Sequence, residues 1–289
     1  MVFLVTLCAS HINNEKRLKH IQNMLMSFLN QSLQTPIFIS ISFDIIFEFH
    51  VDKIIEYYHK KHKTLIKFFK HNKQLSQFEH YSFLVNQFEN ILINHMWCLF
   101  TDDDDYLHPQ RNSSYMKLIQ LANKNKEEIS VVNKTMLTTS WDNTTNVKAL
   151  EFALKRGINR SRVLFANEYV CYCIRVSYFK KYCVFLDKHK KLDTYQCDIV
   201  LGAMLHNICT TFACSGETEW LYAYNNSENH SRMCDIVGVD YYVKNYNDNF
   251  FNDLAKEFNF SWKTDNIGFS TIYSLESFLE AKAKLLNQK

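Results

Sequence analysis

Glycine and proline are scarce in this chain of 289 residues, which has only 5 glycines and 2 prolines. Neither GxGxxG nor GxxxxGK[ST] occurs, which excludes the glycine-rich loops that hold phosphates with backbone N–H groups. A phosphate-handling protein without such loops needs a metal ion or basic side chains. The 9 cysteines form no CxxC pair, which argues against a zinc ribbon or a thioredoxin-like motif.

Long hydrophobic runs are also missing. The most apolar stretch, IFISISFDIIFEF at 37–49, is interrupted by serine and acidic residues, and no run approaches the ~18 residues of a membrane span. The opening MVFLVTLCAS is apolar but lacks a basic leader, which favours a core strand over a signal peptide. An odd number of cysteines in a chain too large to need disulfide staples favours reduced thiols. We therefore expect a cytoplasmic protein without a transmembrane span.

The charge balance is mild, with a net charge of +3 and a pI of about 8.3, and it does not indicate a nucleic-acid partner. Hydrophobic residues make up 47% of the chain, enough to bury a large core. The segment HKKHKTLIKFFKHNK at 59–73 is locally basic. It is either a solvated face or a surface for an anionic donor, a phospholipid membrane or a lipid-linked acceptor.

Predicted strands and helices alternate along the chain, which indicates an α/β fold with a mixed, mainly parallel sheet flanked by helices. We interpret residues 1–235 as one domain and residues 236–289 as a C-terminal helical extension packed on it. The expected strands are 2–8, 37–43, 64–69, 97–100, 129–133 and 168–179. The expected helices are 17–33, 52–60, 77–93, 111–125, 147–156, 197–207, 250–258 and 275–286.

The most informative stretch is WCLFTDDDDYLHP at 97–109, where a buried strand leads into the four carboxylates of residues 102–105. Two carboxylates ~5 Å apart repel by roughly 3 kcal/mol at an effective dielectric of ~20. A hard divalent cation, Mn²⁺ or Mg²⁺, removes that cost and can hold a diphosphate leaving group. A solvated acidic turn is the alternative, but the apolar strand before it and Pro109 after it disfavour that interpretation.

The order and spacing of these features resemble the GT-A superfamily of nucleotide-sugar glycosyltransferases, most closely the inverting family 2 type. The opening VTLCASH precedes a helix that ends SFLNQS, and the second strand ends at Asp44. The fourth strand ends in a DxD-type motif followed by Pro109, and a distal aspartate, Asp198, begins a helix. The resemblance covers roughly residues 1–235, and it implies a Rossmann-like, GT-A-like fold.

The resemblance also implies roles for individual residues. Asp44 would contact the base or the ribose, and Asp104 would be the principal metal ligand. Thr6, Ser10 and Asp44 have a simpler alternative, because strand-end polar residues commonly cap turns. The implied donor-binding residues are Thr6, Ser10, Asp44, Gln77, Asp102 and Asp103, and the implied metal ligands are Asp104, Asp105 and His230.

Inverting transfer needs a base that takes the proton from the acceptor hydroxyl as its oxygen attacks the anomeric carbon. Asp198 is our candidate, because it matches the family's distal aspartate at a helix start. An N-cap is the alternative role for this residue. Asp193, Glu217 and Glu219 are the reserve candidates.

We therefore expect a metal-dependent glycosyltransferase that moves a sugar from a nucleotide-sugar, above all a UDP-sugar, to a hydroxyl of a glycan, protein or lipid-linked acceptor. A sugar-phosphate nucleotidyltransferase is an alternative, although such an enzyme would need a glycine-rich loop after the first strand, and the sequence has none there. A haloacid-dehalogenase-type phosphatase would need an aspartate there, where this chain has CASH. A non-catalytic GT-A-like binding protein is the non-enzymatic alternative.

Overall fold

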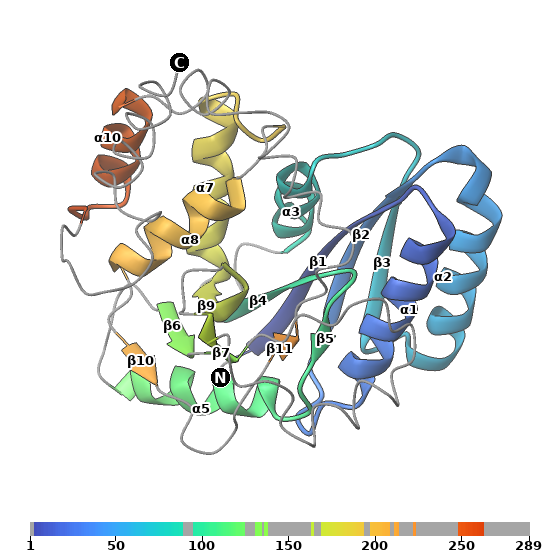
Figure 1. Ribbon diagram of the computed structural model, residues 1–289. Helices are drawn as coiled ribbons and strands as arrows, with labels where there is room; N and C mark the ends of the chain where they lie inside the picture. The colour runs from blue at the N-terminus through green and yellow to red at the C-terminus, as the bar shows by residue number, and fades with distance from the viewer. Residues whose placement is uncertain are drawn as a thin grey trace.

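The computed structural model describes residues 3–88, 95–124, 131–134, 136–137, 163–164, 169–193, 197–208, 211–213, 222–223 and 248–262. In this part of the chain a seven-stranded sheet with the order β10-β6-β9-β4-β1-β2-β3 lies between layers of helices (Figure 1). The predicted α/β class with a mixed, mainly parallel sheet is confirmed.

The first strand lies inside this sheet, next to the central strand β4. β1 pairs in parallel with β2 on one side and with β4 on the other, whereas β9 is antiparallel to both β4 and β6. Two further two-stranded ladders pair β5 with β11 and β7 with β8. The strands are β1 (Phe3–Ile12), β2 (Ile37–Phe43), β3 (Ile66–His71), β4 (Met96–Asp102), β5 (Tyr106–Leu107), β6 (Val131–Lys134), β7 (Met136–Leu137), β8 (Val163–Leu164), β9 (Tyr172–Arg175), β10 (Thr211–Ala213) and β11 (Tyr222–Ala223).

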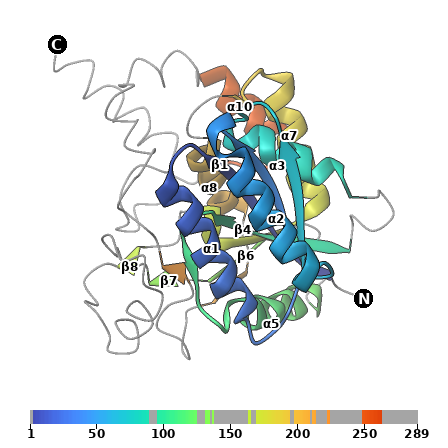
Figure 2. The same ribbon diagram turned by 90° about the vertical axis from the view of Figure 1, so that its right-hand side faces the viewer.

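Two pairs of helices cover opposite faces of the sheet. The helices α1 and α2 lie together on one face, and α3 and α7 pack together on the other (Figures 1 and 2). No helix in the described ranges is long and apolar enough to cross a membrane. The helices are α1 (Glu15–Leu29), α2 (Glu48–His62), α3 (Gln77–Asn86), α5 (Arg111–Lys124), α7 (Val176–Lys188), α8 (Cys197–Ile208) and α10 (Asp248–Glu257), with 3-10 turns η1 (Ile45–Phe47) and η2 (Tyr169–Cys171).

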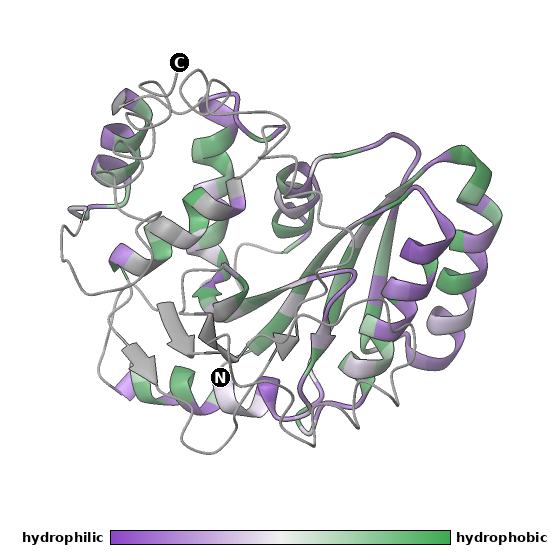
Figure 3. Cartoon of the chain, viewed as in Figure 1, coloured by the Kyte–Doolittle hydropathy of each residue, from purple (hydrophilic) through white to green (hydrophobic). Residues whose placement is uncertain are grey.

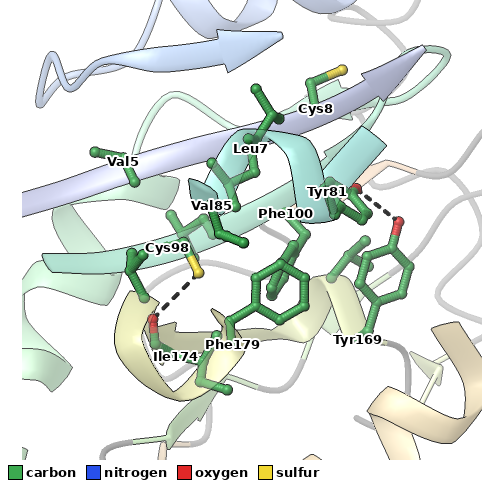
Figure 4. Packing of buried hydrophobic residues seen from close by; sticks show 14 of the residues in the cluster. Val5, Leu7, Cys8, Tyr81, Val85, Cys98, Phe100, Tyr169, Ile174 and Phe179 are labelled. Carbon is green, nitrogen blue, oxygen red and sulfur yellow. Dashed lines mark hydrogen bonds between the residues drawn. The ribbon is translucent and has the colours of Figure 1, made fainter. Parts of the chain in front are cut away.

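The core between the sheet and the α3–α7 layer is aromatic (Figure 4). The Phe100 ring of β4 lies 4.7 Å from Phe179 and 5.5 Å from Tyr81, both edge to face. This is a favoured geometry for aromatic pairs, which adds about 0.5–1.5 kcal/mol to the gain from burial. Hydrophobic residues accordingly concentrate in the central strands, while hydrophilic ones gather along α1 (Figure 3).

Two predicted strand boundaries were wrong. The first strand does not end at residue 8 but runs to Ile12, because β2 continues to pair with it up to Ile12 and Phe43. The predicted strand over 168–179 is limited to β9, and α7 begins at Val176. The buried residues Val176, Phe179 and Tyr182 have helical spacing, although Val176 and Tyr178 also continue the period-two alternation of the strand.

The helix α10 packs on α7 through aromatic side chains. Phe250 lies 5.3 Å from Phe185, and Phe258 lies 5.0 Å from Tyr178, measured between ring centroids. Lys181 pairs with Glu257 at 3.1 Å. The predicted domain boundary at 235/236 and the predicted helices at 147–156 and 275–286 lie outside the described residues.

Candidate active site

The acidic stretch emerges where β4 ends beside a longer β1. Asp102 is the last β4 residue that pairs with β1, opposite Ala9, and β1 continues for three more residues. Ser10 therefore reaches the turn after β4, and its Oγ donates to Asp103 Oδ2 at 2.6 Å. The structure thus brings together two residues that the sequence predicted for one site.

Arg17, which sequence reasoning missed, joins this cluster from the first turn of α1. The Asn14 side chain caps the helix by accepting from the Arg17 N–H at 2.9 Å. Arg17 Nη1 donates to Asp103 Oδ1 at 2.5 Å and lies 3.3 Å from Asp104 Oδ2. A basic residue in the first turn after the first strand was the available signal, because that helix begins at the same edge of the sheet.

Asp102 is held by two neutral donors on the other side of the cluster. Gln77 Nε2 donates to Asp102 Oδ1 at 3.0 Å, and Tyr169 OH donates to the same oxygen at 2.5 Å. Gln77 is the first residue of α3, which a capping box of Ser76 and Glu79 fixes in place. Tyr169 was missed, since it follows Asp102 by 67 positions and no local pattern marks it.

Burial raises the pKa values of two carboxyl groups in this cluster. Desolvation raises the pKa of Asp104 to about 7 although the nearby Arg17 guanidinium opposes the shift. Desolvation likewise raises the pKa of Asp102 to about 6, with the Tyr169 hydrogen bond opposing it and the Asp198 charge adding to it. Carboxyl groups with raised pKa values are typical of functional sites.

The free energy of unfolding should therefore fall as pH rises. Because the folded-state pKa values of Asp102 and Asp104, about 6 and 7, exceed the usual 3.8, the folded state binds more protons than the unfolded chain between about pH 4 and 7. The contribution of these groups is thus lost as pH rises through that window. Urea unfolding at pH 5, 6 and 7.5 without divalent ions measures it, and Asp104→Asn should flatten the dependence. An unchanged slope in the variant would contradict the assignment.

A divalent cation fits the chemistry of these donors. A cation near Asp104 would offset the cost of burying its charge, and carboxylate oxygens are hard ligands. Within the described ranges no group of three or more His, Cys, Asp or Glu side chains is placed to hold a metal. Mg²⁺ sites, however, commonly use one or two carboxylates and take their other ligands from water and substrate phosphates. Asp104 together with a bound diphosphate would be such a set.

The other predicted site residues lie at different depths. Thr6 is fully buried inside β1, opposite Leu99 of β4, and so lies three residues short of the level of Asp102. Asp44 directly follows β2 with its side chain 52% exposed, and it lies 3.5 Å from His11. Asp105 is almost fully buried.

Asp198 is the second residue of α8 and is half-buried. Its charge acts on both Asp102 and Tyr81, which places it on the acidic cluster's side of the core. His230 and the reserve candidates Glu217 and Glu219 lie outside the described residues, while Asp193 is exposed.

A solved structure shares this fold. No protein-family model and no curated protein sequence matches the chain. S. aureus TarS 1-349 in complex with UDP-GlcNAc aligns with 91% of this chain and 68% of that chain, at 14% identity and a TM-score of 0.55. The same fragment with UDP covers 90% and 71% at 13% identity and a TM-score of 0.47, and a further TarS structure covers 90% and 43% at 14% identity and 0.48. The alignment with the UDP-GlcNAc complex, which has the TM-score of 0.55, confirms the GT-A-like fold that the sequence predicted. At 14% identity this likeness is evidence for the fold alone.

Proposed function

We propose that this protein is a metal-dependent glycosyltransferase that transfers a sugar from a nucleotide-sugar donor to an acceptor hydroxyl, with inversion. The observation that carries the proposal is the buried acidic cluster at the carboxyl end of β4. Asp102 and Asp104 have raised pKa values there, beside Arg17. In open α/β sheets, ligands bind at this edge of the strands.

A UDP-sugar is the proposed donor. The TarS fragment of similar fold was crystallised with UDP-GlcNAc and with UDP, which makes UDP-GlcNAc the first donor to test. Asp104, with Asp105 and His230, would hold Mn²⁺ or Mg²⁺, which supplies charge stabilisation to the leaving diphosphate. Asp102, Asp103, Ser10, Gln77 and Thr6 would line or support the donor site, with Asp44 at the base or ribose.

Asp198 is the proposed general base. It begins α8 and lies near enough to Asp102 for its charge to raise the pKa of that carboxyl. An acceptor hydroxyl between Asp198 and the donor would lose its proton to the Asp198 carboxylate as its oxygen attacks the anomeric carbon. The diphosphate would leave on the opposite side.

Product analysis separates this function from its alternatives. The protein would be incubated with UDP-GlcNAc, Mn²⁺ and a panel of glycan, peptide and lipid-linked acceptors. We expect free UDP and a glycosylated product. UTP and sugar phosphate, formed with added pyrophosphate, would instead identify a nucleotidyltransferase. Binding of the donor without any product would support a non-catalytic binding protein.

We also propose peripheral contact with an anionic membrane, through the outer face of α2. Ile45 and Ile46 of the preceding 3-10 turn η1 are 75% and 73% exposed, and Phe49 in the first turn of α2 is 65% exposed. Lys53 and Lys61 follow on the same stripe, and interfacial helices combine such apolar and basic residues. Phe49→Ser should weaken cosedimentation with phosphatidylglycerol vesicles, whereas Val184→Ser, on the exposed side of α7, should not. Equal binding by both variants would reject this surface.

A cytoplasmic location is proposed on the basis of the cysteines. Cys8, Cys98 and Cys173 are free and buried, as expected for thiols that are kept reduced. A native disulfide, found by mass spectrometry in protein purified without reductant, would contradict this location.

A further inference from the structure

A chain of buried and partly buried serines and histidines runs across the sheet next to the candidate site. Ser42 Oγ of β2 lies 2.9 Å from His11 Nδ1 and 3.0 Å from His80 Nε2. The other ring nitrogen of His11, Nε2, faces Asp44 Oδ1 at 3.5 Å. One end of the chain is therefore an exposed carboxylate at the carboxyl edge of the sheet.

The chain continues from His80 to the edge strand. His80 Nδ1 lies 2.7 Å from Ser40 Oγ, which in turn lies 2.7 Å from His71 Nε2. Ser40, Ser42 and His80 are almost completely buried. Five contacts thus link Asp44, His11, Ser42, His80, Ser40 and His71 in that order, with histidines and serine hydroxyls alternating after Asp44. These residues come from β1, β2, β3 and α3, and Asp44 directly follows β2.

When all three rings are neutral, proton counting allows this chain only two arrangements. Burial lowers the pKa of His80 to about 3, so its ring is neutral at pH 7 and carries one N–H. Each serine has one O–H, which can point along the chain in one direction only. The protons therefore lie either all on Nε2 of the three histidines or all on Nδ1. Ser42 could instead donate to Ser10 O, but that distance is 3.5 Å and the contact with His11 is shorter.

We propose that Asp44 sets the direction of this chain, which holds His11, His80 and His71 as Nε2–H tautomers and, through the His11 N–H, orients the Asp44 carboxylate at the donor-binding edge. An ionised aspartate accepts hydrogen bonds only, so His11 Nε2 must carry the proton that faces it. Ser42 then donates to His11 Nδ1, and His80 Nε2–H donates to Ser42. Ser40 donates to His80 Nδ1, and His71 Nε2–H donates to Ser40. Here Asp44 and the three histidines are positioning residues.

This arrangement has a consequence for the ligand, which rests on the proposed function. Uracil carries a hydrogen on N3 and cytosine does not, so an oriented acceptor at the base subsite favours uridine nucleotides. Because cytosine would leave that acceptor facing another acceptor, we expect UDP to bind roughly 10-fold or more tightly than CDP.

Nitrogen-15 NMR of the histidine rings tests the tautomers directly, on the full chain without ligand. We expect Nε2–H signals for His11, His80 and His71 in the unmodified protein. Asp44→Asn should add an Nδ1–H population at His80, because an amide can donate as well as accept. Asp52→Asn is the matched control, since Asp52 is a 53% exposed carboxylate that pairs with Lys70, and it should leave His80 unchanged. Nδ1–H at His80 in the unmodified protein, or no change in Asp44→Asn, would overturn the proposal.

Calorimetric titration with UDP and CDP tests the consequence. A UDP preference that falls at least several-fold in Asp44→Asn, but not in Asp52→Asn, supports the role in base selection. Equal affinities in the unmodified protein would overturn that role. Binding of neither nucleotide would count against the proposed function, while the tautomer result would stand or fall by itself.

Discussion

Replacing Asp198 with asparagine should lower the transfer rate roughly 10²–10⁴-fold, the usual contribution of a positioned base. The substitution keeps the size of the side chain and its hydrogen-bonding oxygen but removes the ability to take a proton. Donor affinity should change little, because Asp198 acts on the acceptor side. Steady-state rates at saturating donor and acceptor would therefore show the loss in kcat, with KM for the donor nearly unchanged.

The control for this substitution is Asp187→Asn. Asp187 is an exposed aspartate near the end of α7, and its replacement should leave kcat within about twofold, as for most surface changes. Near-normal kcat in Asp198→Asn would reject Asp198 as the base. Asp193 and the two reserve glutamates, Glu217 and Glu219, would then be tested by the same substitution to the amide.

Replacing Arg17 with methionine should lower the free energy of unfolding by about 3–5 kcal/mol, the typical cost of removing one partner of a buried ion pair. The Arg17 and Asp103 side chains are only 12% and 5% exposed. Without the guanidinium, Asp103 keeps its Ser10 hydrogen bond but loses its charge partner, and Asp104 loses the cation 3.3 Å away. Urea unfolding at pH 7 measures the change.

Two further variants serve as comparisons for this prediction. Lys53→Met removes a partner from the exposed Lys53–Glu56 pair, whose side chains are 61% and 71% exposed, and should change stability by about 0.5 kcal/mol or less. The double variant Arg17→Met/Asp103→Asn should recover part of the loss, because no charge is then left without its partner in that pair. A loss below about 1 kcal/mol in Arg17→Met would show that the pair is not a structural element of the cluster.

The candidate site was predictable to the extent that it depends on strand ends. An apolar run followed by acids places Asp102 to Asp105 at the carboxyl edge, and parallel strands bring Ser10 to the same edge. The contacts within the cluster were not predictable. Arg17 and Tyr169 reach it through long side chains, from a helix face and a 3-10 turn, and sequence spacing does not determine those directions.

In the fold, too, some features were predictable from the sequence and others were not. Helices and strands with a clear period, such as β2 and α8, lie where the sequence predicts them. The boundary between β9 and α7 was missed because its apolar residues satisfy both periods, and packing against α3 selects the helix. The serine–histidine chain was missed as well. Ser40 and Ser42 look like ordinary interruptions of an apolar strand, and His71 and His80 meet them only when β3 and α3 pack on β2.

The most direct test of the donor site is the thermal stability of the unmodified protein with UDP-GlcNAc, with and without Mn²⁺, compared with Asp104→Asn and with the surface control Asp52→Asn. A ligand at 100 times its Kd adds roughly 2.7 kcal/mol to the free energy of unfolding. In a chain of this size that raises Tm by several degrees. We predict a shift that requires Mn²⁺, persists in Asp52→Asn and is lost in Asp104→Asn. No shift with UDP-GlcNAc or any other nucleotide-sugar, or an equal shift in Asp104→Asn, would contradict the assignment of the acidic cluster as a metal-dependent donor site.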